Sequence, residues 1–283
     1  MSKANFIGFI KLLRLPYWLM TGGLSLLTLL ALWSGQINFY VAILTFLSLA
    51  LLGSAGFSIN DYFDKDSDAI VKPNRPIPHG EVSPKMAIVF SIILFALAML
   101  SSALINWLCL LIVLVDALLL IAYSTYIKRR SGIAANILVG CLTGTAFLYG
   151  EAAGFGAITT ASLSIYPVCI GTIGGNILRD ILSMDGDSKV GYPTLPRKIG
   201  VKKASQVAAF FFLICAFLSP LPYLLNVFGK AYLMLMLPWS IIIISSSIMI
   251  LRSSSPNNIR RNERIITMSM ILLPLALIIE VFL

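Results

Sequence analysis

Charged side chains are scarce in this chain of 283 residues: they make up 12% of it, and only 12 residues are acidic. A soluble domain usually carries about twice that share of charge, so an ordinary water-soluble protein is excluded. Hydrophobic residues make up 58% of the chain, and its mean hydropathy is +0.92. Apolar runs such as 39–59 reach the length of about 20 residues that a helix needs to cross a bilayer. The sequence therefore predicts an all-α, polytopic membrane protein.

Histidine and cysteine are rare as well. The chain has one histidine, and its four cysteines lie inside apolar runs without CxxC spacing (Cys109, Cys141, Cys169 and Cys215). Cysteines in such runs behave as small apolar residues. Neither a disulfide framework nor a Cys/His metal centre is predicted.

Nine apolar segments are long enough to span a membrane. The predicted spans are 16–34, 39–59, 86–104, 107–127, 133–152, 161–178, 206–226, 231–251 and 265–283. No linker separates a soluble domain from this series. We therefore interpret residues 1–283 as a single transmembrane domain.

The net charge of +9 reflects the placement of basic residues along the chain. Of the 21 Lys and Arg residues, all except Lys230 lie before span 1 or in the loops after spans 2, 4, 6 and 8. Basic residues concentrate in cytosolic loops, so the N-terminus is predicted to be cytosolic. Nucleic acid is not an expected partner, and no obligate protein partner is inferred.

Seven of the 12 acidic residues lie in two clusters, each at the predicted cytosolic end of a span. Each cluster is followed by a segment rich in Pro, Gly and basic residues, 71–80 and 189–200. The clustered residues are Asp61, Asp64, Asp66 and Asp68, and then Asp180, Asp185 and Asp187. The repetition favours a functional role for the two clusters over solvated loop charges near lipid headgroups.

The spacing of the first cluster indicates a metal site. If the helix of span 2 continues past Asn60, then Asp61, Asp64 and Asp68 share one face, whereas Asp66 points elsewhere. Three carboxylates on one face repel one another unless a cation lies between them. All-oxygen ligands suit Mg²⁺ or Ca²⁺.

An EF-hand is excluded by two positions of residues 64–75. Position 6 of such a loop is Gly and position 12 is Glu. Here these positions hold Ala69 and Arg75.

Mg²⁺ combines few protein ligands with phosphate oxygens. Lys72 and Arg75 follow the first cluster, and Arg179 and Lys189 flank the second. Carboxylates, metal ions and guanidinium groups together favour a highly anionic ligand such as a diphosphate.

Three segments resemble the UbiA superfamily of intramembrane prenyltransferases. "NDYFDKDSD" (60–68) fits the NDxxDxxxD motif of that family, and "KPNRPIPHG" (72–80) is similar to the segment that follows it there. "RDILSMDGD" (179–187) is similar to the second Asp-rich motif, with Ser183 where the family usually has a carboxylate. Within the superfamily, residues 60–83, 123–150 and 219–237 resemble the branch that makes digeranylgeranylglyceryl phosphate.

The resemblance implies a metal-dependent site. It implies two Mg²⁺ ions that bind a prenyl diphosphate, and Asp61 acts as a ligand or orients one. The catalytic residues implied are Asp64, Asp68, Lys128, Asp180 and Asp187. The metal ligands implied are Asn60, Asp61, Asp64, Asp68, Asp180 and Asp187. The substrate-binding residues implied are Arg14, Lys72, Arg75, Tyr123, Lys128, Asn136 and Arg179.

Other interpretations of three of these residues stay open. Tyr123 could instead belong to the aromatic belt at the membrane interface. Asn136 could hydrogen-bond between helices. Arg14 could be a plain positive anchor before span 1.

Asp116 lies in the middle of span 4, too deep for the metals, and Glu151 is expected on the extracytosolic surface.

The function implied is transfer of a geranylgeranyl group from its diphosphate to the hydroxyl of geranylgeranylglyceryl phosphate, a lipid-like acceptor. The isoprenoid tail would lie in a groove open to lipid, in an integral protein of the cell membrane with a cytosolic active site. One alternative within the fold is an aromatic acceptor, as in quinone synthesis. A transporter of divalent cations or phosphate is the other alternative, which the nearly apolar middles of the spans argue against.

Overall fold

The computed structural model describes residues 3–33 and 38–283, and these residues form helices and no strands. Nine helical segments in the described ranges are long and apolar enough to cross a membrane, as predicted. They are Phe6–Leu32, Phe39–Phe63, Pro84–Ala103, Trp107–Arg130, Gly132–Phe155, Thr160–Leu182, Val201–Leu224, Lys230–Arg252 and Pro256–Val281.

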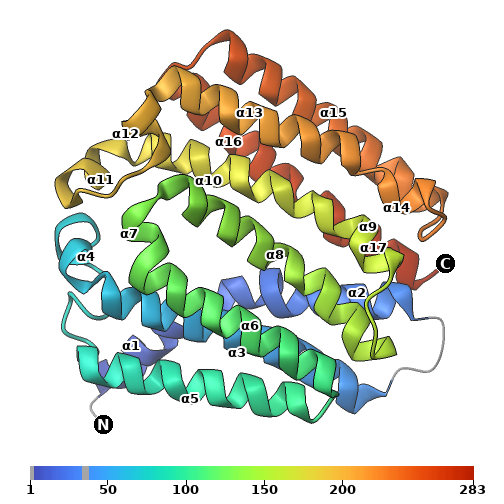
Figure 1. Ribbon diagram of the computed structural model, residues 1–283, viewed down its shortest axis with the longest axis horizontal. Helices are drawn as coiled ribbons and strands as arrows, with labels where there is room; N and C mark the ends of the chain where they lie inside the picture. The colour runs from blue at the N-terminus through green and yellow to red at the C-terminus, as the bar shows by residue number, and fades with distance from the viewer. Residues whose placement is uncertain (1–2, 34–37) are drawn as a thin grey trace.

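The long helices pack in two groups around separate apolar cores (Figure 1). The first group contains α3 (Phe39–Phe63), α5 (Pro84–Ala103), α6 (Trp107–Ala122) and α8 (Gly132–Phe155). The second group contains α10 (Ile170–Leu182), α13 (Val201–Leu218), α15 (Lys230–Arg252), α16 (Pro256–Ser269) and α17 (Leu272–Val281). Helix α2 (Leu24–Leu32) packs against both α8 and α17 and joins the groups.

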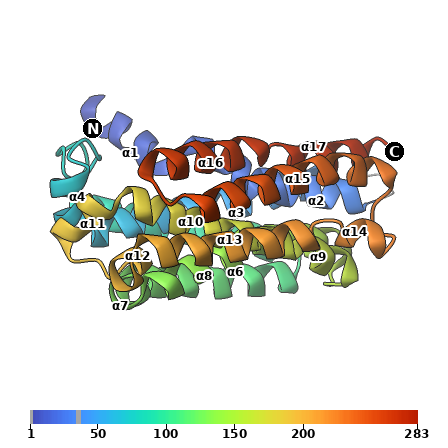
Figure 2. The ribbon, with the colours of Figure 1, turned by 90° about the horizontal axis from the view of Figure 1, so that it is seen from above.

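The short helices are sorted between the two ends of the bundle. Both views place α4 (Lys65–Val71), α7 (Lys128–Arg130), α11 (Met184–Val190) and α12 (Leu195–Ile199) at one end, near α1 (Lys3–Leu13) (Figures 1 and 2). The opposite end carries α9 (Thr160–Ile165), α14 (Leu221–Leu224) and the C-terminus. The loops that carry the two aspartate clusters therefore meet at one end of the bundle.

Side chains at the helix starts explain several boundaries. Each accepts a hydrogen bond from a backbone N–H that the first helical turn leaves unpaired. These capping residues are Asn38 for α3, Ser83 for α5, Asn106 for α6 and Ser131 for α8.

Two ends of predicted spans differ from the structure for identifiable reasons. Span 1 starts at Phe6, and the chain turns at Arg14, whose φ of 48° is left-handed. Span 9 starts at Pro256 because α16 is amphipathic and continues the apolar α17. A hydropathy pattern does not register the charged first turns of α16.

Glu151 is not a surface group, and that expectation was wrong. Its side chain is buried and accepts hydrogen bonds from the backbone N–H groups of Thr159 (2.9 Å) and Ser162 (3.3 Å). It therefore satisfies the unpaired donors at the start of α9.

Candidate active site

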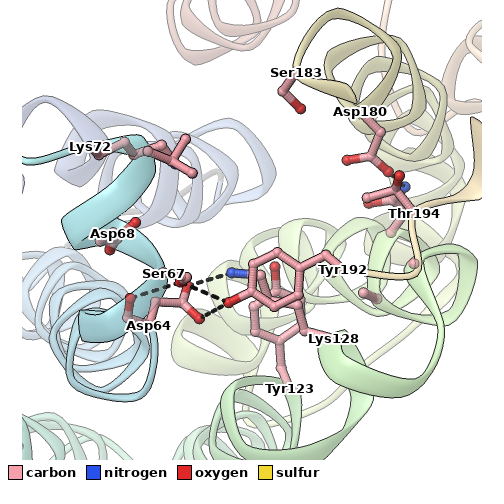
Figure 3. Close-up of a pocket in the computed structure, with 14 residues that line it drawn as sticks. Asp64, Ser67, Asp68, Lys72, Tyr123, Lys128, Asp180, Ser183, Tyr192 and Thr194 are labelled. Carbon is pink, nitrogen blue, oxygen red and sulfur yellow. Dashed lines mark hydrogen bonds and ion pairs between the residues drawn. The ribbon is translucent and has the colours of Figure 1, made fainter. Parts of the chain in front are cut away.

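A cavity of about 200 Å³ opens between the two aspartate-bearing loops (Figure 3). Its walls come from α4, from the segment joining α6 to α8, from the start of α8, from α10 and from the segment before α12. Seven of the predicted site residues line it: Asp64, Asp68, Lys72, Tyr123, Lys128, Asn136 and Asp180. The fold thus brings together residues separated by more than 100 positions in sequence.

The first cluster is divided by a helix break at Asp64. Helix α3 ends at Phe63, and α4 begins at Lys65, although the backbone N–H of Asp64 still bonds to the carbonyl of Asn60 (2.9 Å). The single continuous helix that the spacing assumed is therefore interrupted. Asp64 and Asp68 line the cavity, whereas Asp61 lies outside its lining.

Asp64 is held by contacts from three directions. Its carboxylate forms an ion pair with Lys128 and accepts a hydrogen bond of 2.9 Å from Nδ2 of Asn60. The hydroxyl of Tyr192 donates to its other oxygen across 2.7 Å. Charge-assisted hydrogen bonds of this kind are strong, so the position of Asp64 is well defined.

Asp61 and Asp68 are bridged by one arginine. A single terminal nitrogen of Arg75 lies 2.5 Å from Asp61 and 2.7 Å from Asp68. Arg14 adds a second contact to Asp61 at 2.6 Å. Asp61 is 3% exposed, so the two guanidinium groups offset the cost of burying its charge. Arg14 and Arg75 lie outside the cavity lining, and they pair with Asp61 and with Asp68 of the lining.

The opposite wall is built from α10 and α8. Nδ2 of Asn136 donates a hydrogen bond of 2.8 Å to Asp180. Ser183 also lines the cavity, in the place where a carboxylate was expected by resemblance. The side chain of Asp187, predicted as a ligand and catalytic residue, lies outside the described residues, and its role stays a prediction.

Arg179 lies beside the site rather than in the cavity lining. Its side chain pairs with Glu263 on α16 at 3.2 Å and bonds to Asn176 at 3.0 Å. Its predicted contact with a diphosphate stays a prediction.

Lys72 brings a positive charge to the cavity wall. Partial desolvation lowers its pKa from the ordinary lysine value, and the charge of Arg75 lowers that pKa further. The carboxylate of Asp68 acts in the opposite sense. A bound polyanion would relieve this destabilisation of the charged lysine.

Tyr192 lines the cavity and contacts Asp64, although the sequence did not indicate it. Besides its bond to Asp64, its hydroxyl lies 3.1 Å from that of Ser67, and Nζ of Lys128 lies 4.8 Å from its ring centre. Burial raises the pKa of Tyr192 above the ordinary tyrosine value, so its hydroxyl stays protonated and donates to Asp64. The residue ties the α10 side of the cavity to the α4 side.

A close backbone approach holds the segment that carries Tyr192. The N–H of Gly132, at the start of α8, donates to the carbonyl of Pro193 (3.0 Å). A Cβ atom on Gly132 would lie 2.8 Å from Cα of Thr194 and 2.9 Å from that carbonyl oxygen. Only glycine allows this contact.

The residues present fit a divalent cation with oxygen ligands. Oδ1 of Asn60 is buried and has no hydrogen-bond partner among the described residues. The neighbouring Asp64 lines the cavity. No three His, Cys, Asp or Glu side chains in the described ranges are placed to hold an ion by themselves. Mg²⁺ suits such a site, because it is often bound by one or two carboxylates plus phosphate oxygens.

Asp116 is buried in the membrane-spanning part of α6, away from this cavity. Oγ1 of Thr145 on α8 donates a hydrogen bond to it (2.6 Å). This contact gives the buried carboxyl a polar partner between two helices.

Comparison with known proteins decides the family. The UbiA prenyltransferase family model matches residues 19–271, nearly the whole chain and both aspartate-bearing loops. The chain belongs to the UbiA prenyltransferase family. In this UbiA prenyltransferase a cavity lies between two Asp-bearing loops, and the described residues contain nine candidate membrane-spanning helices.

Curated relatives of this UbiA prenyltransferase are identical to it at more than a third of the aligned positions. A digeranylgeranylglyceryl phosphate synthase of Natronomonas pharaonis is 38% identical over 234 residues, which cover 82% of this chain and 83% of the relative. The enzyme of that name from Methanothermobacter thermautotrophicus is 35% identical, covering 86% of each chain.

Solved structures share the fold. One, described with structural and mechanistic insights into digeranylgeranylglyceryl phosphate synthase in membranes, is 29% identical with a TM-score of 0.85, over 98% of both chains. A UbiA homologue from Archaeoglobus fulgidus bound to GPP and Mg²⁺ is 22% identical with a TM-score of 0.77. It covers 97% of this chain and 98% of its own.

Proposed function

We propose that this UbiA prenyltransferase transfers a geranylgeranyl group from its diphosphate to the hydroxyl of geranylgeranylglyceryl phosphate. The observation that carries the proposal is one cavity lined by carboxylates from both loops (Asp64, Asp68, Asp180) and by two lysines (Lys72, Lys128). The curated relatives bear the name of that activity. Their names favour a glycerol-phosphate acceptor over an aromatic one.

Two Mg²⁺ ions fit the chemistry of the two walls. Asn60, Asp64 and Asp68 would hold one ion, and Asp180 and Asp187 the other, while the homologue from Archaeoglobus fulgidus supports the choice of metal. When bound, such ions neutralise the diphosphate leaving group. Asp61 would stay paired with Arg14 and Arg75 and position the ligands, because its contacts are already satisfied.

The lysines and Tyr123 act on the donor. Lys72 and Lys128 lie on the cavity wall, where they would stabilise negative charge on the departing diphosphate. Tyr123 lies on a π-helical turn, Tyr123–Ile127, and lines the same cavity. Its ring would shield positive charge that develops at the allylic carbon. The C–O bond to diphosphate breaks, the acceptor hydroxyl forms the new C–O bond at that carbon, and its proton passes to an aspartate or to the departing diphosphate.

The cavity end of the bundle would face the cytosol. The basic loops that predict this topology lie at that end, together with α1 (Figure 1). Lys230 begins α15 at the opposite end, where α14 and the C-terminus lie. Substrates with anionic heads would thus enter from the cytosol, with their tails in the lipid of the cell membrane.

A competition assay tests the acceptor. Purified protein receives Mg²⁺, geranylgeranyl diphosphate and an equimolar mixture of geranylgeranylglyceryl phosphate and 4-hydroxybenzoate, and the products are identified by mass spectrometry. We expect the bis-geranylgeranylated glycerol phosphate to dominate. A prenylated arene as the main product would reject the proposed acceptor and leave the family assignment intact.

A further inference from the structure

A second cavity, of about 310 Å³, adjoins the active-site cavity. Ser67 and Tyr192 line both cavities, and their hydroxyl oxygens lie 3.1 Å apart (Figure 3). These two side chains therefore form a shared wall. The second cavity is completed by Phe63, Asp66, Arg129 and Gly191.

Arg129 is the cationic group among the described residues of this second lining. One of its terminal nitrogens donates to the backbone carbonyl of Phe63 at 2.9 Å, which fixes the guanidinium at the cavity wall. A guanidinium has five N–H donors in a planar fork. The remaining donors suit an oxyanion with several acceptor oxygens, such as a phosphate.

The proposed reaction joins two anionic substrates, so it needs two anion sites close together. Asp64, Asp68 and Asp180 make the first cavity unfavourable for an anion without metal ions. A second anion in that cavity would also repel the diphosphate. A separate cation behind a shared wall keeps the two headgroups apart while their reacting atoms remain near each other.

We propose that the second cavity binds the phosphate of the acceptor, with Arg129 as its ligand. This inference rests on the proposed function and adds the acceptor subsite to it. The Ser67–Tyr192 wall then separates the acceptor phosphate from the donor diphosphate. The acceptor hydroxyl reaches past this wall toward the first cavity.

Asp66 carries a negative charge in the same lining as the positive Arg129, so it provides a second test of the proposal. Its exposed carboxylate lies in the lining of the second cavity and not in that of the first. A carboxylate near a bound phosphate weakens binding, because like charges repel. Asp66→Asn should therefore lower the acceptor KM, whereas Arg129→Gln should raise it.

The experiment measures KM for both substrates in full-length protein reconstituted in detergent or liposomes. Hydrogen bonds to charged groups contribute enough that Arg129→Gln should raise the acceptor KM at least about tenfold. The donor KM should stay within about twofold of the original value. The matched control is Arg130→Gln, since Arg130 lies over the ring of Tyr126 and outside both linings.

Four results would overturn the inference. They are an unchanged acceptor KM in Arg129→Gln, an equal rise in Arg130→Gln, a parallel rise in the donor KM, or a higher acceptor KM in Asp66→Asn. Arg129→Lys keeps the charge, so its acceptor KM should lie between the values of the original protein and of Arg129→Gln. It replaces Arg129→Gln in the test if that variant does not fold. Ether formation by the unaltered protein is measured first, so failure of the proposed function is seen separately from failure of this subsite.

Discussion

The hydroxyl of Tyr192 donates a hydrogen bond of 2.7 Å to Asp64, across the cavity that separates the two aspartate-bearing loops. The same side chain contacts Ser67 and lies against Lys128. One residue from the second loop therefore orients the carboxylate and the cation of the first. This relationship leads to the first prediction.

Tyr192→Phe should lower kcat/KM about tenfold or more, because it removes a hydrogen bond to a charged group. It keeps the ring beside Lys128, so the protein should still fold. The measurement is steady-state kinetics over a range of Mg²⁺ concentrations, and the Mg²⁺ requirement should rise because Asp64 is less well oriented. Tyr166→Phe is the control, since that hydroxyl bonds only to the carbonyl of Cys141 (3.1 Å) among the described contacts. Equal activity in both variants would contradict this role.

Gly132→Ala should reduce activity strongly without unfolding the bundle. The added methyl group would meet backbone atoms of Thr194 and Pro193 at 2.8 and 2.9 Å, so the segment that carries Tyr192 must move. A displacement of about 1 Å at an active site can reduce the rate by about 100-fold. Gly175→Ala is the control, because its methyl group would meet only the end of Arg179, at 3.8 Å. If both variants keep the original kcat, the close approach does not position the site.

Arg75→Gln should lower the free energy of unfolding by about 3 kcal/mol, because breaking a buried ion pair leaves uncompensated charge. Arg75 is the bridge between Asp61 and Asp68, and both carboxylates are buried. Chemical unfolding in detergent micelles measures the change. Lys11→Gln should have a much smaller effect, since its pair with Glu81 is exposed. Equal destabilisation in the two variants would count against the buried network.

Donor binding should weaken at alkaline pH because of Lys72. Desolvation lowers its pKa from 10.5, and only the protonated lysine attracts a diphosphate. As pH rises through this lowered pKa, the charge is lost earlier than for an ordinary lysine, and the donor KM should rise. In Lys72→Arg the guanidinium stays charged, so the rise should shift to higher pH. A pH dependence of the donor KM that is identical in the two proteins would exclude Lys72 as its origin.

The membrane scaffold was largely predictable from the sequence, because apolar length alone defines a span. All nine predicted spans are confirmed, and the errors lie at their ends. The start of α16 was missed because its charged first turns lower the local hydropathy, and the left-handed turn at Arg14 was missed because hydropathy does not report backbone conformation. The burial of Glu151 was also not predicted, because its hydrogen bonds depend on the start of helix α9 folding back onto it.

The sequence predicted which acidic residues form the site better than it predicted their geometry. The spacing of Asp64 and Asp68, together with the second cluster, correctly indicated that two loops meet. It did not predict that the helix breaks at Asp64 or that Asp61 turns to Arg14 and Arg75. Tyr192 lies in a nonperiodic segment between α11 and α12, so no pattern placed its side chain. The Pro/Gly-rich run 189–200 was the only signal that this segment mattered.

The most direct test of the central claim follows the oxygen atom of the new ether. Purified protein is given geranylgeranyl diphosphate and geranylgeranylglyceryl phosphate whose free hydroxyl carries ¹⁸O, with Mg²⁺ or with a chelator in excess. The account predicts an ether product that retains the ¹⁸O, unlabelled diphosphate, and no product in the presence of chelator. Label in the released diphosphate, an ether without label, or full activity in excess chelator would contradict it.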